Sequence, residues 1–275
     1  MDYQNWVGRN ETVQDTVTLR QAAQMAALLD QPFDLTHGSA LPPLWHWMAF
    51  QPVAPMSALG PDGHPHRGGF LPPVALERRM WAGGRLAFHQ PLAVGIAMQR
   101  RSEIVKVVEK QGAAGAMVFV TVNHTIRQSG VDCVSDEQDL VFVAIPLRYS
   151  PPAPNPVPSD PLWRQDQTID PVRLFRFSAI TFNGHRIHYD LEYAQKVEHY
   201  PGLVVHGPYQ ALLLIDAAQH RAGGAAPARY SYRGVRPLFH TDRMELVGLA
   251  ADTEALTLCT ANGEGLQCMQ AKVEW

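Results

Sequence analysis

A run of prolines divides this chain into two parts. Six of the eleven residues from 151 to 161 are proline, and such a run favours an extended segment without internal hydrogen bonds. It separates residues 1–150 from residues 162–275. A chain of 275 residues suits one large domain or two of moderate size. We therefore expect two halves joined by a proline-rich linker over 151–161.

A short repeat relates the two halves. Residues 83–89 read GGRLAFH and residues 234–240 read GVRPLFH, so four of seven positions are identical at a constant offset of 151. Both stretches stand at the start of a series of strand-like runs. The repeat predicts that the halves share one architecture, and the recurring Arg85 and Arg236 are expected to serve that architecture.

The hydrophobic pattern predicts antiparallel strands and a few helices in each half. Apolar residues alternate with others as they do in a strand with one buried face, for example at Val118, Val120 and Val122. The expected strands are 86–88, 93–108, 116–127, 140–145, 228–236, 244–251, 255–260 and 266–273. The expected helices are 19–29, 43–50, 74–81 and 211–221. The pattern predicts an α+β protein in which each half wraps a sheet around one apolar helix.

Two blocks in the second half are rich in residues that can take part in catalysis. Residues 182–190 read FNGHRIHYD, and residues 200–208 read YPGLVVHGP. The second block reads as a helix start, because proline in the first turn of a helix removes no hydrogen bond. The free N–H groups of a helix start stabilise developing negative charge. His188 in the first block titrates near neutral pH, so the two blocks together favour proton transfer beside a polarised carbonyl group.

These blocks resemble the hydratase motif of the MaoC-like, hotdog-fold acyl-thioester hydratases and dehydratases. The resemblance is nearest to the itaconyl-CoA and mesaconyl-C4-CoA hydratases and the mitochondrial-type 3-hydroxyacyl-thioester dehydratases. It covers residues 170–275 well and the first half only loosely. It implies a double hotdog fold, in which two hotdog halves form a pseudo-dimer within one chain.

The sequence departs from the family motif at its acidic residue. In the motif four residues separate an Asp from a His, and the His follows Asn-Pro-Ile; here Ile187 and His188 match, whereas Asn183 replaces the Asp. An amide does not titrate near neutral pH. The resemblance therefore implies that His188 is the acid/base and that Asn183 orients water or the thioester. Asn183 is equally compatible with a tight turn, because Asn-Gly favours turns.

Two further residues are catalytic candidates by the resemblance. Gly207 is expected to donate its backbone N–H to the thioester oxygen, although a glycine also suits a tight turn. Asp190 is expected to assist His188, although its place before 191–198 favours a helix N-cap. The substrate-binding candidates are His185, Arg186, Tyr189, His206, Arg67 and Arg233. For His206 the alternative is a buried partner that orients the loop.

Composition excludes several other classes of protein. A net charge of −3 argues against binding to nucleic acid, no apolar run is long enough to span a bilayer, and the N-terminus lacks an export pattern. The cysteines Cys133, Cys259 and Cys268 have no paired spacing and are expected to be reduced and structural. Asp62, His64 and His66 lie in a flexible loop without a fourth ligand, so no metal is expected. We expect a cytoplasmic enzyme.

The resemblance implies reversible addition of water to an α,β-unsaturated acyl-CoA. The nearest subgroup implies a short branched dicarboxylyl substrate, itaconyl-CoA or mesaconyl-C4-CoA, a product such as citramalyl-CoA, and a place in itaconate degradation. No cofactor is expected beyond the coenzyme A of the substrate, because a thioester acidifies its own α-position. The partner is thus the acyl-CoA, and association into a homodimer stays open.

Three points about substrate choice follow from this expectation. The distal carboxylate of such a substrate requires an arginine, for which Arg67, Arg79 and Arg186 are candidates. The first half contains no copy of FNGHRIHYD, so we expect one active site per chain, with the first half shaping the acyl pocket. The alternatives are a 3-hydroxyacyl-ACP or -CoA dehydratase of fatty-acid synthesis and a non-catalytic hotdog protein that binds acyl thioesters.

Overall fold

The computed structural model describes residues 2–112 and 115–275, which form two compact units. The first unit comprises the chain up to Ala82, Leu86–Ile145 and Arg176–His185, and the second comprises Gly83–Arg85, Pro146–Phe175 and Arg186–Trp275. The segment Arg176–His185 therefore belongs to the first unit, although it follows the proline-rich segment in sequence.

The first unit contains a five-stranded sheet. Its elements are β1 (Asn10–Asp15), α1 (Leu19–Leu28), β2 (Arg78–Phe88), β3 (Met98–Gly112), β4 (Gly115–Gln128) and β5 (Val131–Val143), with single 3-10 turns at Tyr3–Trp6, Trp45–Met48 and Met56–Ala58. The strand order is β1-β3-β4-β5-β2. The pairs β1–β3, β3–β4 and β4–β5 are antiparallel. Val118, Val120 and Val122 are all at most 4% exposed and lie in the core, as their alternation predicts.

The second unit repeats this plan with more helix. Its elements are β6 (Trp163–Gln167), η4 (Arg186–His188), α3 (Leu191–Lys196), α4 (Gly207–Arg221), β7 (Arg229–Gly234), β8 (Met244–Ala251), β9 (Ala255–Ala261) and β10 (Gln267–Glu274). A further helix, α2 (Pro171–Ile180), begins in the second unit and ends in the first. The strand order β6-β8-β9-β10-β7 matches β1-β3-β4-β5-β2 element for element. The predicted shared architecture of the two halves is thus present in the topology.

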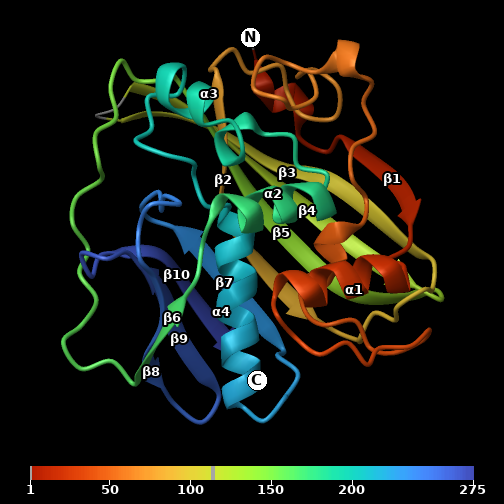
Figure 1. Ribbon diagram of the computed structural model, residues 1–275. Coiled ribbons are helices and arrows are strands. Elements are labelled where there is room, and N and C mark those ends of the chain that lie inside the picture. Colours follow the sequence, from red (N-terminus) through yellow and green to blue (C-terminus); the bar gives the residue numbers. More distant parts are fainter. Residues whose placement is uncertain (1, 113–114) are drawn as a thin grey trace. The chain divides into compact units, whose positions relative to one another are not determined.

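Helix α4 forms the centre of the second unit. Every residue from Tyr209 to Ile215 is buried, and α4 contacts each of the strands β7 to β10, which curve around it in Figure 1. A helix that is apolar on all sides must be covered on all sides. The predicted helix over 211–221 is confirmed, and it starts earlier, at Gly207.

The seven-residue sequence repeat does not align the structurally equivalent residues of the two halves. In the first unit the N–H groups of His89 and Gln90 donate to the carbonyl oxygen of Cys133, at 2.8 and 3.2 Å. In the second unit the N–H groups of Val235 and Arg236 donate in the same way to Cys268, at 2.8 and 3.1 Å. His89 therefore corresponds to Val235 and not to His240, because the strand pairing defines the equivalence and the seven-residue match does not.

Two predicted helices are wrong. Residues 74–81 form a loop and the start of β2, and residues 43–50 contain only the 3-10 turn Trp45–Met48. The side chain of Arg67 donates to the carbonyl oxygens of Val74, Leu76 and Glu77, which satisfies acceptors that a helix would have used. These bonds hold the segment before β2 in an extended form.

Strands β1 and β6 and helix α2 are absent from the sequence prediction. Helix α2 carried a readable start, because Asp170 accepts from the N–H of Arg173 at 2.9 Å and proline follows at position 171. Asp before Pro is a common helix opening. The two strands are short, and their exposed faces are polar, which leaves little hydrophobic alternation to detect.

The proline-rich segment is bound to the second unit and is not a free spacer. The N–H of Val157 donates to Gly265 O at 2.9 Å, and the N–H of Gln267 donates to Asn155 O at 2.8 Å. The side-chain amide of Gln267 also donates to Pro156 O at 3.0 Å. Proline has no backbone N–H to donate but keeps its carbonyl oxygen, and the side chain of Gln267 donates to that of Pro156.

The three cysteines are free and buried, as predicted. Burial raises the pKa of the Cys259 and Cys268 thiols to about 12, so neither is a reactive thiolate near neutral pH. In the described parts of the chain, no helix combines the length and the apolar character that crossing a membrane requires.

Candidate active site

His188 is held in one tautomer by the backbone. It lies in the 3-10 turn η4 with 7% of its surface exposed, and its Nδ1 is 2.7 Å from the carbonyl oxygen of Val204. A carbonyl oxygen only accepts hydrogen bonds, so Nδ1 carries the hydrogen and Nε2 carries the lone pair that titrates. The ring therefore has the tautomer and the fixed orientation that a general base needs.

His206 stacks on His188. The ring centroids are 3.6 Å apart and the planes differ by 19°. His206 is fully buried, and burial, followed by the charge of His188, lowers the pKa of His206 well below its usual value. His206 is therefore neutral at pH 7 and supports the ring of His188, which agrees with the alternative that it orients the loop.

The segment before α4 fixes both histidines. The N–H of Val204 donates to Ile187 O at 3.0 Å, so Val204 bonds the 3-10 turn through its N–H and its carbonyl. On its other side, the N–H of Val205 donates to Leu238 O at 2.8 Å. Ile187 packs in an apolar cluster with Tyr193, Tyr200 and Phe239. The apolar residues of both blocks thus position the polar ones.

Gly207 starts α4, as the sequence predicts, with Pro208 in the first turn. The first N–H groups of a helix have no acceptor within the helix, and none is found for Gly207 in the described part of the chain. Because Gly207 directly follows His206, which stacks on His188, this donor lies beside the titrating ring. The second unit thus contains both a helix start and a buried histidine with a fixed tautomer.

Asn183 stands in a tight turn, which is the second of the two interpretations given above for this residue. Its side-chain oxygen accepts from the N–H of His185 at 3.0 Å, and its own N–H donates to Ser178 O at 2.8 Å. These bonds leave the side-chain NH₂ group as the part of Asn183 that is available for other contacts. The water-orienting role of Asn183 remains a prediction.

Asp190 is the N-cap of α3, as its alternative interpretation predicts. One carboxylate oxygen accepts from the N–H of Tyr193 at 3.0 Å. The other accepts from Arg186, at 3.0 Å from Nε and 2.7 Å from Nη2. The Tyr193 N–H and Arg186 lower the pKa of Asp190, in that order. A carboxylate with both oxygens bonded in this way is poorly suited to proton transfer, and we do not include Asp190 in the proposed catalytic set.

Other substrate-binding candidates are dispersed. Tyr189 is exposed, and Arg186 is paired with Asp190 while its guanidinium lies 4.2 Å from the ring centroid of Tyr193. Arg67 is bonded to backbone carbonyl oxygens, and Arg233 is exposed and donates to Gln270 at 3.0 Å.

A cluster that the sequence did not predict lies in the first unit. Ligand-type atoms of Asp62, His64 and His185 all lie within 4.8 Å of one another. Asp62 and His64 were singled out by their spacing, but their third neighbour comes from the FNGHRIHYD block and not from His66. Only the density of histidines in both segments hinted at this proximity.

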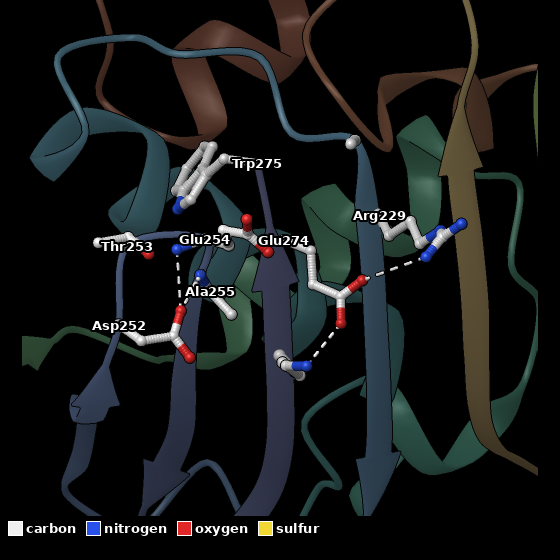
Figure 2. Close-up of a pocket in the computed structure, with 9 residues that line it drawn as sticks. Arg229, Asp252, Thr253, Glu254, Ala255, Glu274 and Trp275 are labelled. Atoms are coloured by element: carbon white, nitrogen blue, oxygen red, sulfur yellow. Dashed lines mark hydrogen bonds and ion pairs between the residues drawn. The ribbon is translucent and has the colours of Figure 1, made fainter.

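A surface hollow of about 710 Å³ lies elsewhere in the second unit and is lined by strand ends of β7, β9 and β10 (Figure 2). Its charged groups are engaged with one another: Glu274 pairs with Arg229 at 3.7 Å and with Lys272 at 2.5 Å. Asp252 accepts from the N–H groups of Glu254 and Ala255. None of the motif residues lines this hollow, so it is not the candidate active site.

The arrangement in the second unit defines a class of protein. An enzyme that forms an enolate from an acyl thioester needs a base and a donor that stabilises negative charge. A histidine with a fixed tautomer and a helix start can supply these two functions. The chain belongs to the hydroxyacyl-thioester dehydratase type 2 family, whose sequence model matches residues 44–240.

Individual relatives agree with this family. The mesaconyl-C(4)-CoA hydratase of Chloroflexus aurantiacus is 43% identical over 99% of this chain and 98% of its own. A solved structure of a MaoC-like dehydratase aligns over all of both chains, with a TM-score of 0.75 and 16% identity. A Mycobacterium tuberculosis protein described as a double hotdog aligns over 99% of this chain and 98% of its own, with a TM-score of 0.55 and 15% identity.

The comparisons confirm the predicted double hotdog fold and the predicted enzyme class. The chain is a hydratase or dehydratase of acyl thioesters. The alternative of a hotdog protein without turnover, which the Asn183 replacement raised, is therefore not retained.

Proposed function

We propose that the enzyme adds water reversibly to a short branched dicarboxylyl enoyl-CoA, mesaconyl-C4-CoA or itaconyl-CoA, and forms a 3-hydroxyacyl-CoA such as citramalyl-CoA. The observation that carries this proposal is the 43% identity, over nearly the whole chain, to an enzyme named for mesaconyl-C(4)-CoA. The geometry around His188 supports the same type of reaction.

The proposed reaction uses His188 as the base and the start of α4 as the donor to the thioester oxygen. Nε2 of His188 takes a proton from water as its oxygen attacks the β-carbon, and the electrons of the double bond move into a thioester enolate. The N–H of Gly207 at the start of α4 stabilises the enolate oxygen; one such donor is typically worth about 2.7–4 kcal/mol. His188 then returns its proton to the α-carbon. In this scheme Asn183 orients the water through its NH₂ group.

The reaction requires no metal or redox cofactor in this proposal. Water addition changes no oxidation state overall, and the thioester carbonyl itself acidifies the α-position. Coenzyme A enters as part of the substrate.

The test is a spectrophotometric assay of enoyl-thioester absorbance with purified protein. We expect hydration of mesaconyl-C4-CoA or itaconyl-CoA with kcat/KM at least 100-fold above that for crotonyl-CoA or a long-chain trans-2-enoyl-CoA. Equal or higher kcat/KM for the long-chain substrate would contradict the proposed substrate class.

A second candidate is a 3-hydroxyacyl-thioester dehydratase of fatty-acid synthesis. The family match over residues 44–240 favours it, since that family is named for this reaction. It uses the same His188 chemistry with a longer apolar acyl chain. The assay above separates the two candidates when the long-chain substrate is supplied both as the CoA and as the acyl-carrier-protein thioester.

A further inference from the structure

A polar cluster of the first unit joins the loop before β2 to the FNGHRIHYD block. Nδ1 of His64 lies 3.0 Å from a carboxylate oxygen of Asp62, and the ring centroids of His64 and His185 are 4.4 Å apart. The two loops touch through glycines, because a Cβ atom on Gly184 would lie 2.7 Å from the carbonyl oxygen of Gly63. This close approach requires glycine at position 184 and fixes His185 against His64.

Arg79 adds a positive charge to this cluster. It lies in β2, and its charge acts on both Asp62 and His64. Burial lowers the pKa of Arg79 to about 10, Asp62 raises it and Arg67 lowers it. Burial, and then the charge of Arg79, lower the pKa of His64 to about 4, although Asp62 raises it. His64 is therefore neutral at pH 7 while Arg79 is charged.

Among the three arginines considered for a substrate carboxylate, only Arg79 is available. Arg67 donates to the carbonyl oxygens of Val74, Leu76 and Glu77. Arg186 is bonded to Asp190. The side chain of Arg79 has no hydrogen bond or ion pair within 4 Å to any described residue, and it is only partly exposed. A guanidinium removed from water without a direct partner favours binding of an anion.

The balance of charge also favours an anion over a metal ion. Asp62 supplies one negative charge, whereas Arg79 and Arg67 both act on this cluster with positive charge. A divalent cation between His64, His185 and Asp62 would be repelled by both arginines. A carboxylate would neutralise the charge of Arg79 and accept a hydrogen bond from the His185 imidazole.

We propose that Arg79, together with His185, binds the distal carboxylate of the acyl group, and that His64 holds the ring of His185 in place. This inference rests on the proposed function and adds to it the residue that selects a dicarboxylyl substrate. The guanidinium of Arg79 forms the bidentate pair with the carboxylate. Neutral His64 donates its one N–H, on Nδ1, to Asp62, so of the two imidazoles His185 is the one that donates to the carboxylate. His185 is three residues before His188, so one residue of the proposed carboxylate subsite stands in the same block as the proposed catalytic histidine.

The test compares two unreactive ligands that differ by one carboxylate, succinyl-CoA and butyryl-CoA, by calorimetry with the whole protein. Hydrogen bonds to charged groups contribute about 1.5–3 kcal/mol, so the wild type should bind succinyl-CoA about 10- to 100-fold more tightly. Arg79→Gln should remove this preference and leave the affinity for butyryl-CoA unchanged. Arg101→Gln, which alters an exposed β3 arginine paired with Glu103, is the matched control and should keep the preference.

Circular dichroism would establish that each variant is folded. If Arg79→Gln does not fold, Arg79→Lys keeps the charge but loses bidentate geometry, and it should retain only part of the preference. A preference that survives in a folded Arg79→Gln or an undiminished preference in Arg79→Lys overturns this inference, as does a wild type that binds both ligands equally. Turnover of mesaconyl-C4-CoA or itaconyl-CoA by the wild type in those cases would leave the proposed function standing, and its absence would remove the proposed function independently.

Discussion

At the residue scale, a backbone carbonyl and a stacked ring hold His188 in place. The Val204 carbonyl fixes the hydrogen on Nδ1, and His206 supports the ring by stacking. We expect His188→Ala to lower turnover by roughly 100- to 10,000-fold, the usual range for a positioned acid/base. The fold should persist, because Ile187 and not His188 anchors the turn in the apolar cluster.

The matched control is His220→Ala at the exposed end of α4, which should keep full activity. Turnover and thermal unfolding are measured side by side. Near-native turnover of a stable His188→Ala protein would remove His188 from the mechanism.

Asn183 offers a second test, because its two side-chain groups have separable roles. Its oxygen accepts from the His185 N–H, a bond that aspartate would preserve. We expect Asn183→Ala to be strongly impaired, and Asn183→Asp to retain activity, since aspartate serves in related hydratases. Steady-state kinetics of the two variants decide the matter. An aspartate variant as inactive as the alanine variant would show that the NH₂ donor is needed.

The buried histidines predict how stability depends on pH. Burial, followed by the opposing effect of Asp136, leaves the pKa of His124 at about 4, below its ordinary value of 6.5. Between these values the unfolded chain binds more protons than the folded chain, so the free energy of unfolding falls as pH decreases from 6.5 to 4. The contribution of His124 to this fall is on the order of 3 kcal/mol.

Calorimetric unfolding between pH 7.5 and 4 measures this dependence. His124→Gln should reduce the steepness of the fall, because glutamine can still bond Ser102 but does not titrate. His220→Gln, an exposed histidine, should leave the steepness unchanged. Parallel curves for the wild type and His124→Gln would count against a depressed pKa at His124.

At the element scale, α3 shows how one carboxylate serves structure. Asp190 caps α3 and pairs with Arg186. We expect Asp190→Ala to lower stability by about 1 kcal/mol, the usual cost of a lost N-cap. Asp190→Asn keeps the capping oxygen and should retain both stability and most activity. If Asp190→Asn were as inactive as His188→Ala in the same assay, Asp190 would be catalytic after all.

At the scale of the whole molecule, two units share one strand order but only one carries the motif. FNGHRIHYD and YPGLVVHGP occur once, so an intact chain should bind one acyl-CoA. Calorimetric titration with butyryl-CoA, a saturated analogue, measures the stoichiometry. Two equivalent sites per chain would contradict this expectation.

The sequence by itself determined the elements whose residues interact locally. The stretch Ala211–Ile215 of α4 is wholly apolar, β8 and β9 consist mostly of apolar residues, and Pro208 after Gly207 is a local signal for a helix start. For Asn183 and Asp190 the resemblance implied catalysis, whereas the local pattern indicated a turn and an N-cap, and the sequence alone could not choose between them. The family resemblance made His188 the candidate base, because the motif spans only a few residues.

Tertiary structure decided whatever depends on residues far apart in the chain. The extended form of 74–77 depends on the side chain of Arg67, and the register of the duplication depends on which strand bonds Cys133 and Cys268. The contact between His64 and His185 spans more than a hundred residues and leaves no periodic trace in the sequence. Hydrogen bonds and charges of this kind are fixed only when the fold brings their partners together, which is why the availability of Arg79 became visible only in the structure.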